Sequence, residues 1–171
     1  MTTAKVSQTA PSSLHRLAEL SAQRLATADL VAAAKWGTNT PIDDPAREQQ
    51  VIDTVRAQAA KVGADPRTIE MIFRDQMTAN KIVQRGLYQS WERDPSKVPD
   101  ERPDLAKDVR PVIDRIDSEL VQAIAEYSRP SHACDRPLSA TTMQVRHEKR
   151  LDLLHYRALN RSLNSVCGVG E

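Results

Sequence analysis

The sequence predicts an all-α fold: a single-domain helical bundle of about five to six helices, with long first and third helices. Its 171 residues are enough for one domain with a substantial core, which argues against a two-domain enzyme. The chain has only 5 glycines and 4% aromatic residues, whereas Leu, Ala, Arg, Gln and Glu, which favour helices, are abundant. Apolar residues also recur at steps of three and four. These observations argue against Rossmann, barrel and sandwich architectures.

The chain is predicted to open with a disordered lead over residues 1–10, followed by one helical domain over residues 11–171. The first helix begins at residues 11–13, where Pro and Ser offer a helix start. Its apolar residues continue for about 24 residues until Gly37 and the Asn-Thr-Pro cluster behind it end the helix.

An Asp-Pro pair starts each of the next two helices, at residues 44–45 and 65–66. The Asp oxygen caps free amides, and Pro at the first helical position sacrifices no hydrogen bond. The second helix is expected to stop at Gly63, and the third to extend to Trp91.

A proline-rich surface loop over residues 95–103 separates these helices from the rest of the chain. A further helix is expected over residues 104–127, in which Pro111 either introduces a kink or marks the true first turn. After a loop over residues 130–137, a last helical pattern ends near Gly168.

The charge balance and the apolar runs exclude several classes of partner. Lys and Arg number 24 against 23 Asp and Glu, so no net field holds a nucleic acid or an anionic membrane. The longest apolar run is far shorter than the roughly 20 residues that span a bilayer. A late basic cluster is interpreted as a solvated helix face rather than a nucleic-acid patch; it consists of Arg146, His147, Lys149 and Arg150.

No metal site is expected, because the four histidines lack ligand spacing and no HExxH or paired Cys/His pattern occurs. No Ser or Cys lies in a nucleophile motif either. The histidines are His15, His132, His147 and His155.

Two long cations lie on the apolar face of the first helix. Arg24 and Lys35 are eleven residues apart, three turns plus about 20°, so both project from one face. The small residues between them, Ala28, Val31 and Ala32, leave a hollow about 16 Å long with positive charge at both ends. This shape suits a compact dianion. The alternative is that both cations snorkel from the edge of a core face.

Amides occupy the apolar face of the third helix at four-residue steps: Gln76, Asn80 and Gln84. They form either a ligand site or interhelical hydrogen bonds that set the register of the bundle. In the first turn of the second helix, the dipole disfavours Arg47, which suggests a carboxylate nearby. An exposed surface ion pair is the bland alternative for Arg47.

This order of polar residues resembles the all-helical chorismate mutases, and within them the secreted, exported subclass. The resemblance covers about residues 14–167. It is carried by residues 23–34 and by Lys35-Trp36-Gly37, Pro41-Ile42-Asp43-Asp44-Pro45, Arg47-Glu48, Asp75-Gln76 and Asn80-Lys81. Enzymes of this family convert chorismate to prephenate by a Claisen rearrangement, without a cofactor or a covalent intermediate.

The resemblance implies a role for each polar position. Arg24 holds one substrate carboxylate, and Lys35 reaches the other carboxylate and the ether oxygen. Gln84 donates to the ether oxygen from the opposite side, and Asn80 helps with a carboxylate. Where some members carry a hydroxyl and an acid, this chain has the neutral Asn80 and Gln84. Lys35 and Gln84 are therefore the expected catalytic residues.

At the other end of the expected site, the resemblance implies that Glu48 accepts from the ring hydroxyl while Asp44 and Arg47 orient that end. A late-helix arginine completes the site within one chain, so that a homodimer would have one complete site per chain. Arg110 is the best match for this arginine, with Arg115 as a close alternative.

Two other functions fit the same fold. One is an isochorismate pyruvate lyase, which also breaks the ether bond in a pericyclic step. The other is a non-catalytic exported helical adaptor that uses only its surface. Incubation with each substrate distinguishes the two enzymes, and loss of turnover without loss of fold after substitution of Arg24, Lys35 or Gln84 excludes the adaptor.

The two cysteines, Cys134 and Cys167, fit one disulfide, with two free buried thiols as the alternative. We expect the bond, and with it a periplasmic or secreted location and a signal peptide absent from this numbering; a cytoplasmic location is the alternative. A straight helix over residues 139–166 would be about 40 Å long and would keep the sulfurs apart. The bond therefore requires a helical hairpin with a break around residues 144–149.

Overall fold

The structure is a computed structural model that describes residues 12–127 and 134–168; the predicted lead over residues 1–10 lies outside these ranges. Within them the chain is all-α, as predicted. The six α-helices are α1 (Ser13–Lys35), α2 (Pro45–Val62), α3 (Pro66–Arg93), α4 (Arg110–Glu126), α5 (Asp135–Lys149) and α6 (Leu153–Ser162). A 3₁₀ turn, η1 (Pro95–Lys97), and one turn of wider helix, η2 (Leu105–Val109), lie between α3 and α4.

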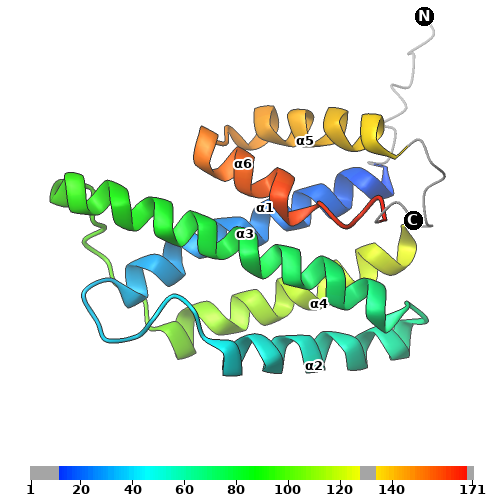
Figure 1. The fold of residues 1–171 in the computed structure, drawn as a ribbon, viewed down its shortest axis with the longest axis horizontal. Helices are drawn as coiled ribbons and strands as arrows, with labels where there is room; N and C mark the ends of the chain where they lie inside the picture. The colour runs from blue at the N-terminus through cyan, green and yellow to red at the C-terminus, as the bar shows by residue number, and fades with distance from the viewer. Residues whose placement is uncertain (1–11, 128–133, 169–171) are drawn as a thin grey trace, which may run out of the picture.

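The helices form three layers of two (Figure 1). The long helices α1 and α3 contact each other in the middle layer, as expected from their apolar faces. Helices α2 and α4 cover one side of this layer, and α5 and α6 cover the other. No helix of the described ranges is long and apolar enough to cross a membrane.

The predicted starts of the first three helices and the predicted stop of the second are confirmed. The side chains of Ser12, Asp44 and Asp65 each accept a hydrogen bond from an amide in the first turn of the helix that follows. Gly63 ends α2 in the left-handed conformation at φ 73°, which glycine adopts without steric cost. The first three helices therefore follow from local chemistry.

Two prolines lie in first turns. Pro111 is the second residue of α4, so it marks the first turn and does not kink the helix. Pro137 lies in the first turn of α5, and the loop predicted to reach Pro137 therefore ends earlier, at Cys134. Both positions are tolerated because a first-turn residue has no intrahelical acceptor for its N–H.

Helices α5 and α6 form the predicted hairpin, but its break lies just beyond the predicted window. Helix α5 runs to Lys149, and Arg150 then reverses the chain in the left-handed conformation at φ 52°. Asp152 caps α6 by accepting from the amide of His155 at 2.8 Å. The sequence did not locate the break because an arginine occupies the position that glycine usually takes.

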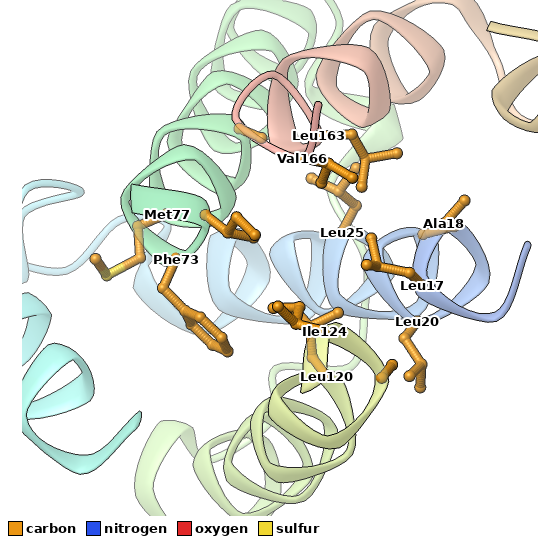
Figure 2. Packing of buried hydrophobic residues seen from close by; sticks show 14 of the residues in the cluster. Leu17, Ala18, Leu20, Leu25, Phe73, Met77, Leu120, Ile124, Leu163 and Val166 are labelled. Atoms are coloured by element: carbon orange, nitrogen blue, oxygen red, sulfur yellow. The ribbon is translucent and has the colours of Figure 1, made fainter. Parts of the chain in front are cut away.

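Figure 2 shows the part of the core where α1, α3, α4 and the segment after α6 meet; α2, α5 and α6 add further buried apolar residues to the same core. Leu17 on α1, Phe73 on α3, Leu120 on α4 and Leu163 after α6 are all fully buried. Burying each of these side chains contributes about 1.5–3 kcal/mol. This shared core holds the middle layer rigidly, and the middle layer supplies much of the site described below.

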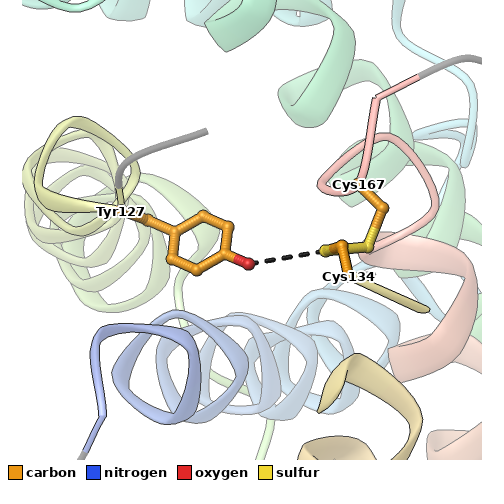
Figure 3. Close-up of a disulfide and its surroundings, with 3 residues drawn as sticks. All are labelled: Tyr127, Cys134 and Cys167. Carbon is orange, nitrogen blue, oxygen red and sulfur yellow. Dashed lines mark hydrogen bonds between the residues drawn. A yellow bond between two sulfur atoms is a disulfide. The ribbon is translucent and has the colours of Figure 1, made fainter. Parts of the chain in front are cut away.

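The disulfide predicted between Cys134 and Cys167 is present, with 5.5 Å between the two Cα atoms (Figure 3). It joins the start of α5 to the segment after α6, so it closes the open end of the hairpin. The hydroxyl of Tyr127, which follows α4, lies 3.4 Å from the sulfur of Cys134. The alternative of two free thiols is wrong.

Candidate active site

A half-open pocket lies between α1, α2, α3, η2 and the start of α4. It encloses about 640 Å³ of space not filled by atoms, including solvent at its mouth. The structure places all of the predicted substrate-binding residues in its wall: Arg24, Lys35, Asp44, Arg47, Glu48, Asn80, Gln84 and Arg110. Four elements that are distant in the sequence therefore bring these side chains to one place.

The two cations of α1 line the pocket with Val31 between them, which agrees with the predicted shared face. Ala28 and Ala32 are fully buried and line the core rather than the pocket. Arg24 and Lys35 are themselves only 4% and 8% exposed, so neither snorkels to solvent. The snorkelling alternative is therefore wrong.

Lys35 at the end of α1 holds the loop that leads to α2. Its Nζ donates to the carbonyl oxygen of Pro41 at 2.9 Å and to that of Ile42 at 3.4 Å. Burial lowers the pKa of Lys35 from its usual value, the negative charge of Asp44 opposes this shift, and the positive charge of Arg110 adds to it. The ammonium group is thus partly desolvated and faces a second cation.

Of the three amide side chains of α3, one forms interhelical hydrogen bonds and two line the pocket. Gln76 is fully buried and donates to the Oγ of Ser21 and to the carbonyl oxygen of Ser162, so it joins helices and sets their register. Asn80 and Gln84 line the pocket instead, and the Nε2 of Gln84 donates to the Oδ1 of Asn80 at 2.6 Å. The Oε1 of Gln84 is buried without a hydrogen-bond partner among the described residues.

The acidic end of the pocket is built on the first turn of α2. Asp44 caps that helix and so faces the pocket from a rigid position. Arg47 pairs with the carboxylate of Asp114 at 2.9 Å. This is the nearby carboxylate that was expected from the position of Arg47 in the first turn of the helix. Asp114 is exposed, so the contact is a surface ion pair, and its Arg47 side lines the pocket. Glu48 accepts a hydrogen bond from Lys81 at 2.8 Å.

Arg110, the first residue of α4, lines the pocket, whereas Arg115 is exposed and does not. The wide turn η2 directly precedes Arg110 and contributes Leu105 to the same wall. Of the two arginines considered from the sequence, Arg110 is therefore the one that the fold brings to the pocket.

Sequence reasoning missed two charged residues at this site. Lys81 lines the pocket and contacts both Glu48 and Asp43, at 2.8 and 3.2 Å. Asp117 lies behind the pocket wall, buried against Arg24. Asp117 had a signal in the sequence, since it follows Ile113 by four residues on the apolar face of its helix. Lys81 stands in the Asn80-Lys81 pair that carries the resemblance, but it was given no role, because its partners come from another helix and a loop.

Basic side chains outnumber acidic ones in the wall of the pocket. The wall carries five basic residues, Arg24, Lys35, Arg47, Lys81 and Arg110, and two acidic ones, Asp44 and Glu48. Three of these cations also pair with carboxylates outside the wall, those of Asp117, Asp114 and Asp43. Partly desolvated cations attract anions more strongly than exposed ones do. Such a pocket can bind a compact dianion and stabilise negative charge that develops on it. The described residues include no cluster of three or more His, Cys, Asp or Glu side chains suited to a metal ion.

Known proteins share both the sequence and this architecture. A family model described as chorismate mutase type II matches residues 15–85. The secreted chorismate mutase of Mycolicibacterium smegmatis is 35% identical over 153 residues, which cover 88% of this chain and 84% of that protein. The chain belongs to the chorismate mutase family. Its expected all-helical fold and the resemblance drawn from its polar residues are both confirmed.

Further chorismate mutases agree with this membership. The secreted chorismate mutase of Mycobacterium tuberculosis is 31% identical over 160 residues, covering 91% of this chain and 79% of that protein. The crystal structure of chorismate mutase from Burkholderia thailandensis superimposes with a TM-score of 0.87 at 33% identity, covering 92% of this chain and all of that one. The similarity therefore extends well past residue 85 to the α5–α6 hairpin.

Proposed function

We propose that the pocket binds chorismate and rearranges it to prephenate within a single chain. The observation that carries this proposal is the enclosure of an amide pair and five cations in one pocket of a chorismate mutase fold. Chorismate is a dianion with an ether oxygen, and the pocket offers cations for both carboxylates and amide donors for the ether. As family membership implies, the protein is an enzyme that isomerises its substrate.

The proposed binding mode assigns the two carboxylates first. Arg24 holds one carboxylate and Lys35 the other, with Asn80 assisting and Arg110 adding a cation from α4. The burial of Arg24 and Lys35 supports these roles, because a charge-assisted hydrogen bond is stronger where water is excluded. Glu48 accepts from the ring hydroxyl, and Asp44 and Arg47 orient that end of the substrate.

The reaction breaks the C–O bond of the ether while a C–C bond forms, with no proton transfer and no change in composition. Catalysis must therefore come from holding the reactive conformer and from donors aimed at the ether oxygen as negative charge grows there. Lys35 and Gln84 are the proposed donors. Lys35 donates to two loop carbonyl oxygens, and a bound substrate would take over these contacts with its own oxygens.

The proposed role of Gln84 requires an N–H hydrogen of its side-chain amide that is free to bind the ether oxygen. Its Nε2 donates one hydrogen to Asn80 and retains a second. This second hydrogen is the one proposed to reach the ether oxygen of the substrate.

The direct test is an assay of purified protein with chorismate, following its loss and the appearance of prephenate. Parallel incubation with isochorismate, following release of pyruvate, tests the lyase alternative. Turnover of chorismate that disappears in Arg24→Ala, Lys35→Ala and Gln84→Ala variants with intact helical circular dichroism supports the proposal. Folded wild-type protein that leaves chorismate unchanged contradicts it and favours a non-catalytic adaptor.

We also propose that the protein works outside the cytoplasm, in the periplasm or after secretion. The disulfide supports this, since such bonds persist in oxidising compartments, and two relatives are named secreted chorismate mutases. Because the eight expected binding residues of one chain lie together in its pocket, a homodimer would have one complete site per chain. Activity proportional to protein concentration across a monomer–dimer transition, followed by light scattering, tests this site arrangement. We propose no nucleic-acid partner.

A further inference from the structure

Arg24 is held from behind by a carboxylate on another helix. Its Nε donates to the Oδ1 of Asp117 on α4 at 2.6 Å, and the two residues are each only 4% exposed. The guanidinium also lies 5.9 Å from the ring centre of Phe73 on α3. Three helices therefore determine where one side chain of the pocket points.

This contact has a directional consequence for the guanidinium group. A guanidinium can bind a carboxylate through its Nε edge or through its two terminal nitrogens. Asp117 occupies the Nε, whereas neither terminal nitrogen has an acceptor among the described residues. Because Arg24 lines the pocket, the terminal edge is the one left for an anion there.

We propose that Asp117 is a positioning residue for substrate binding: it fixes Arg24 so that the terminal nitrogens, and not the Nε, receive a substrate carboxylate. The inference rests on the proposed function for the identity of that carboxylate. Asp117 does not line the active-site pocket and does not touch substrate itself. It borders a separate cavity between α2 and α4.

The buried carboxylate of Asp117 has two effects on Arg24: it fixes the position of the guanidinium and it balances the positive charge. An arginine side chain has many rotamers, and ordering it during binding would reduce affinity. Because Asp117 already orders the Arg24 side chain in the folded protein, that loss of entropy occurs during folding and not during substrate binding. Asp117 also balances the charge of a buried guanidinium, whose isolation from solvent without a partner would be strongly destabilising.

The kinetic test compares Asp117→Asn with Glu126→Gln, a matched control that removes the same charge from an exposed position near the end of α4. Loss of the positioning contact is expected to lower kcat/KM about 100-fold, a usual cost of misplacing a substrate-binding group. Most of the loss should be in KM, because the carboxylate is bound in both the ground state and the transition state. Glu126→Gln should keep wild-type constants.

A double variant separates positioning from a general effect on folding. If Asp117 acts through Arg24, Arg24→Gln with Asp117→Asn should be no less active than Arg24→Gln alone. The double variant should also be more stable than Arg24→Gln alone, because that single variant leaves the carboxylate of Asp117 buried without a partner. Losses of kcat/KM that add in the double variant would overturn the proposal, as would full kcat/KM in Asp117→Asn.

Asp117→Glu provides the test if Asp117→Asn does not fold. It retains the charge, and the cavity beside Asp117 offers space for one more methylene. Moving the carboxylate is expected to lower kcat/KM about tenfold even though the guanidinium stays paired. A folded Asp117→Glu variant with wild-type kcat/KM would mean that the position of Arg24 does not depend on this contact.

An NMR measurement keeps the inference independent of the proposed reaction. The Arg24 Nε–H signal, identified by its loss in Arg24→Lys, should be protected from hydrogen exchange in wild type and in Glu126→Gln. It should exchange about tenfold faster in Asp117→Asn, since a neutral acceptor binds the hydrogen more weakly. Absence of protection in wild type contradicts the positioning contact, whereas protection without chorismate turnover contradicts only the proposed function.

Discussion

Lys35 is a buried cation of the pocket whose pKa responds both to burial and to neighbouring charges. Burial lowers the pKa of Lys35, the charge of Asp44 opposes this shift, and the charge of Arg110 adds to it. The proposed role requires the protonated form, which donates hydrogen bonds to a carboxylate and to the ether oxygen. Activity should therefore begin to fall on the alkaline side below the usual lysine value of 10.5.

Replacement of Lys35 by Ala should affect catalysis more than stability. Loss of a preorganised donor to a developing oxyanion typically lowers kcat about 10²- to 10³-fold, and loss of the carboxylate contact should raise KM as well. Steady-state kinetics measure both, with the exposed Lys61→Ala as a control for charge. Near-normal kcat in a folded Lys35→Ala variant would contradict the proposed donor role.

Replacement of Gln84 by Glu should make the activity depend on acid. Wild-type kcat/KM should be nearly flat over about pH 5–8, because an amide donates at any pH in this range. The carboxylate of Gln84→Glu would face the ether oxygen at neutral pH, so activity should drop there and recover as acid protonates it. Nearby Arg24 and Lys35 favour the charged form and shift recovery to lower pH.

Profiles of kcat/KM for both proteins from about pH 4 to 8 decide this point. Activity equal to wild type at neutral pH, without any gain in acid, would show that Gln84 does not contact the ether oxygen.

At the scale of elements, the α5–α6 hairpin is attached to the middle layer by polar contacts as well as by its apolar faces. On α3, the carboxylate of Asp75 binds both Arg161 and Ser165. Helix α6 also packs closely on α3 at Gly86. A Cβ atom built on this glycine would lie only 2.7 Å from the side chain of Leu154, so a larger residue there would displace that side chain. The hairpin supports α3 from the face opposite the pocket, so it stabilises the helix that carries Asn80 and Gln84.

The contact of His155 with α1 predicts a pH-dependent contribution of the hairpin to stability. The hydrogen bond to Asp29 raises the pKa of His155 to about 9; burial opposes the shift, and the bond to Asp152 supports it. Because the folded-state pKa exceeds the unfolded value of 6.5, the contribution is complete below pH 6.5 and is lost as pH rises through about 9.

His155→Gln should therefore lower Tm at pH 6 by about 2–4 °C, corresponding to about 1 kcal/mol, and should have much less effect at pH 10. Thermal melts of both proteins at the two pH values measure this difference. An equal Tm difference at pH 6 and pH 10 would mean that the charge of His155 does not stabilise the fold.

At the scale of the whole molecule, the disulfide should contribute to stability without contributing to the reaction. It closes a segment whose ends are 33 residues apart, and constraint of the unfolded chain over such a loop is worth about 3–4 kcal/mol. No residue of α5 or α6 lines the pocket.

The Cys134→Ser/Cys167→Ser variant should consequently melt about 10 °C below wild type, while its kcat at 25 °C changes little. Melts of wild type with and without a thiol reductant provide the matching comparison. Two titratable thiols in the oxidised protein, or a Tm that reductant does not change, would contradict the predicted role of the bond.

Much of the fold could be predicted from the sequence because it depends on local chemistry. Local signals fix both ends of α2, which Asp44 caps and the left-handed Gly63 ends. Asp65 fixes the start of α3 in the same way. These signals act through residues close in the sequence and do not depend on tertiary contacts. The hairpin break lies beyond the predicted residues because Arg150 adopts a left-handed conformation that a side chain disfavours, and the tertiary packing of α6 offsets that cost.

The sequence by itself determined the all-α class, the apolar faces, the cysteine pair and the polar positions typical of the family, since each depends on spacing along one helix or on residue type. Only the tertiary structure decided that Gln76 joins helices while Asn80 and Gln84 face the pocket, and that Arg110 rather than Arg115 reaches it. It also decided that Asp117 is the partner of Arg24. The physical reason is that such contacts depend on how helices pack against each other, which the spacing of residues along a single helix does not specify.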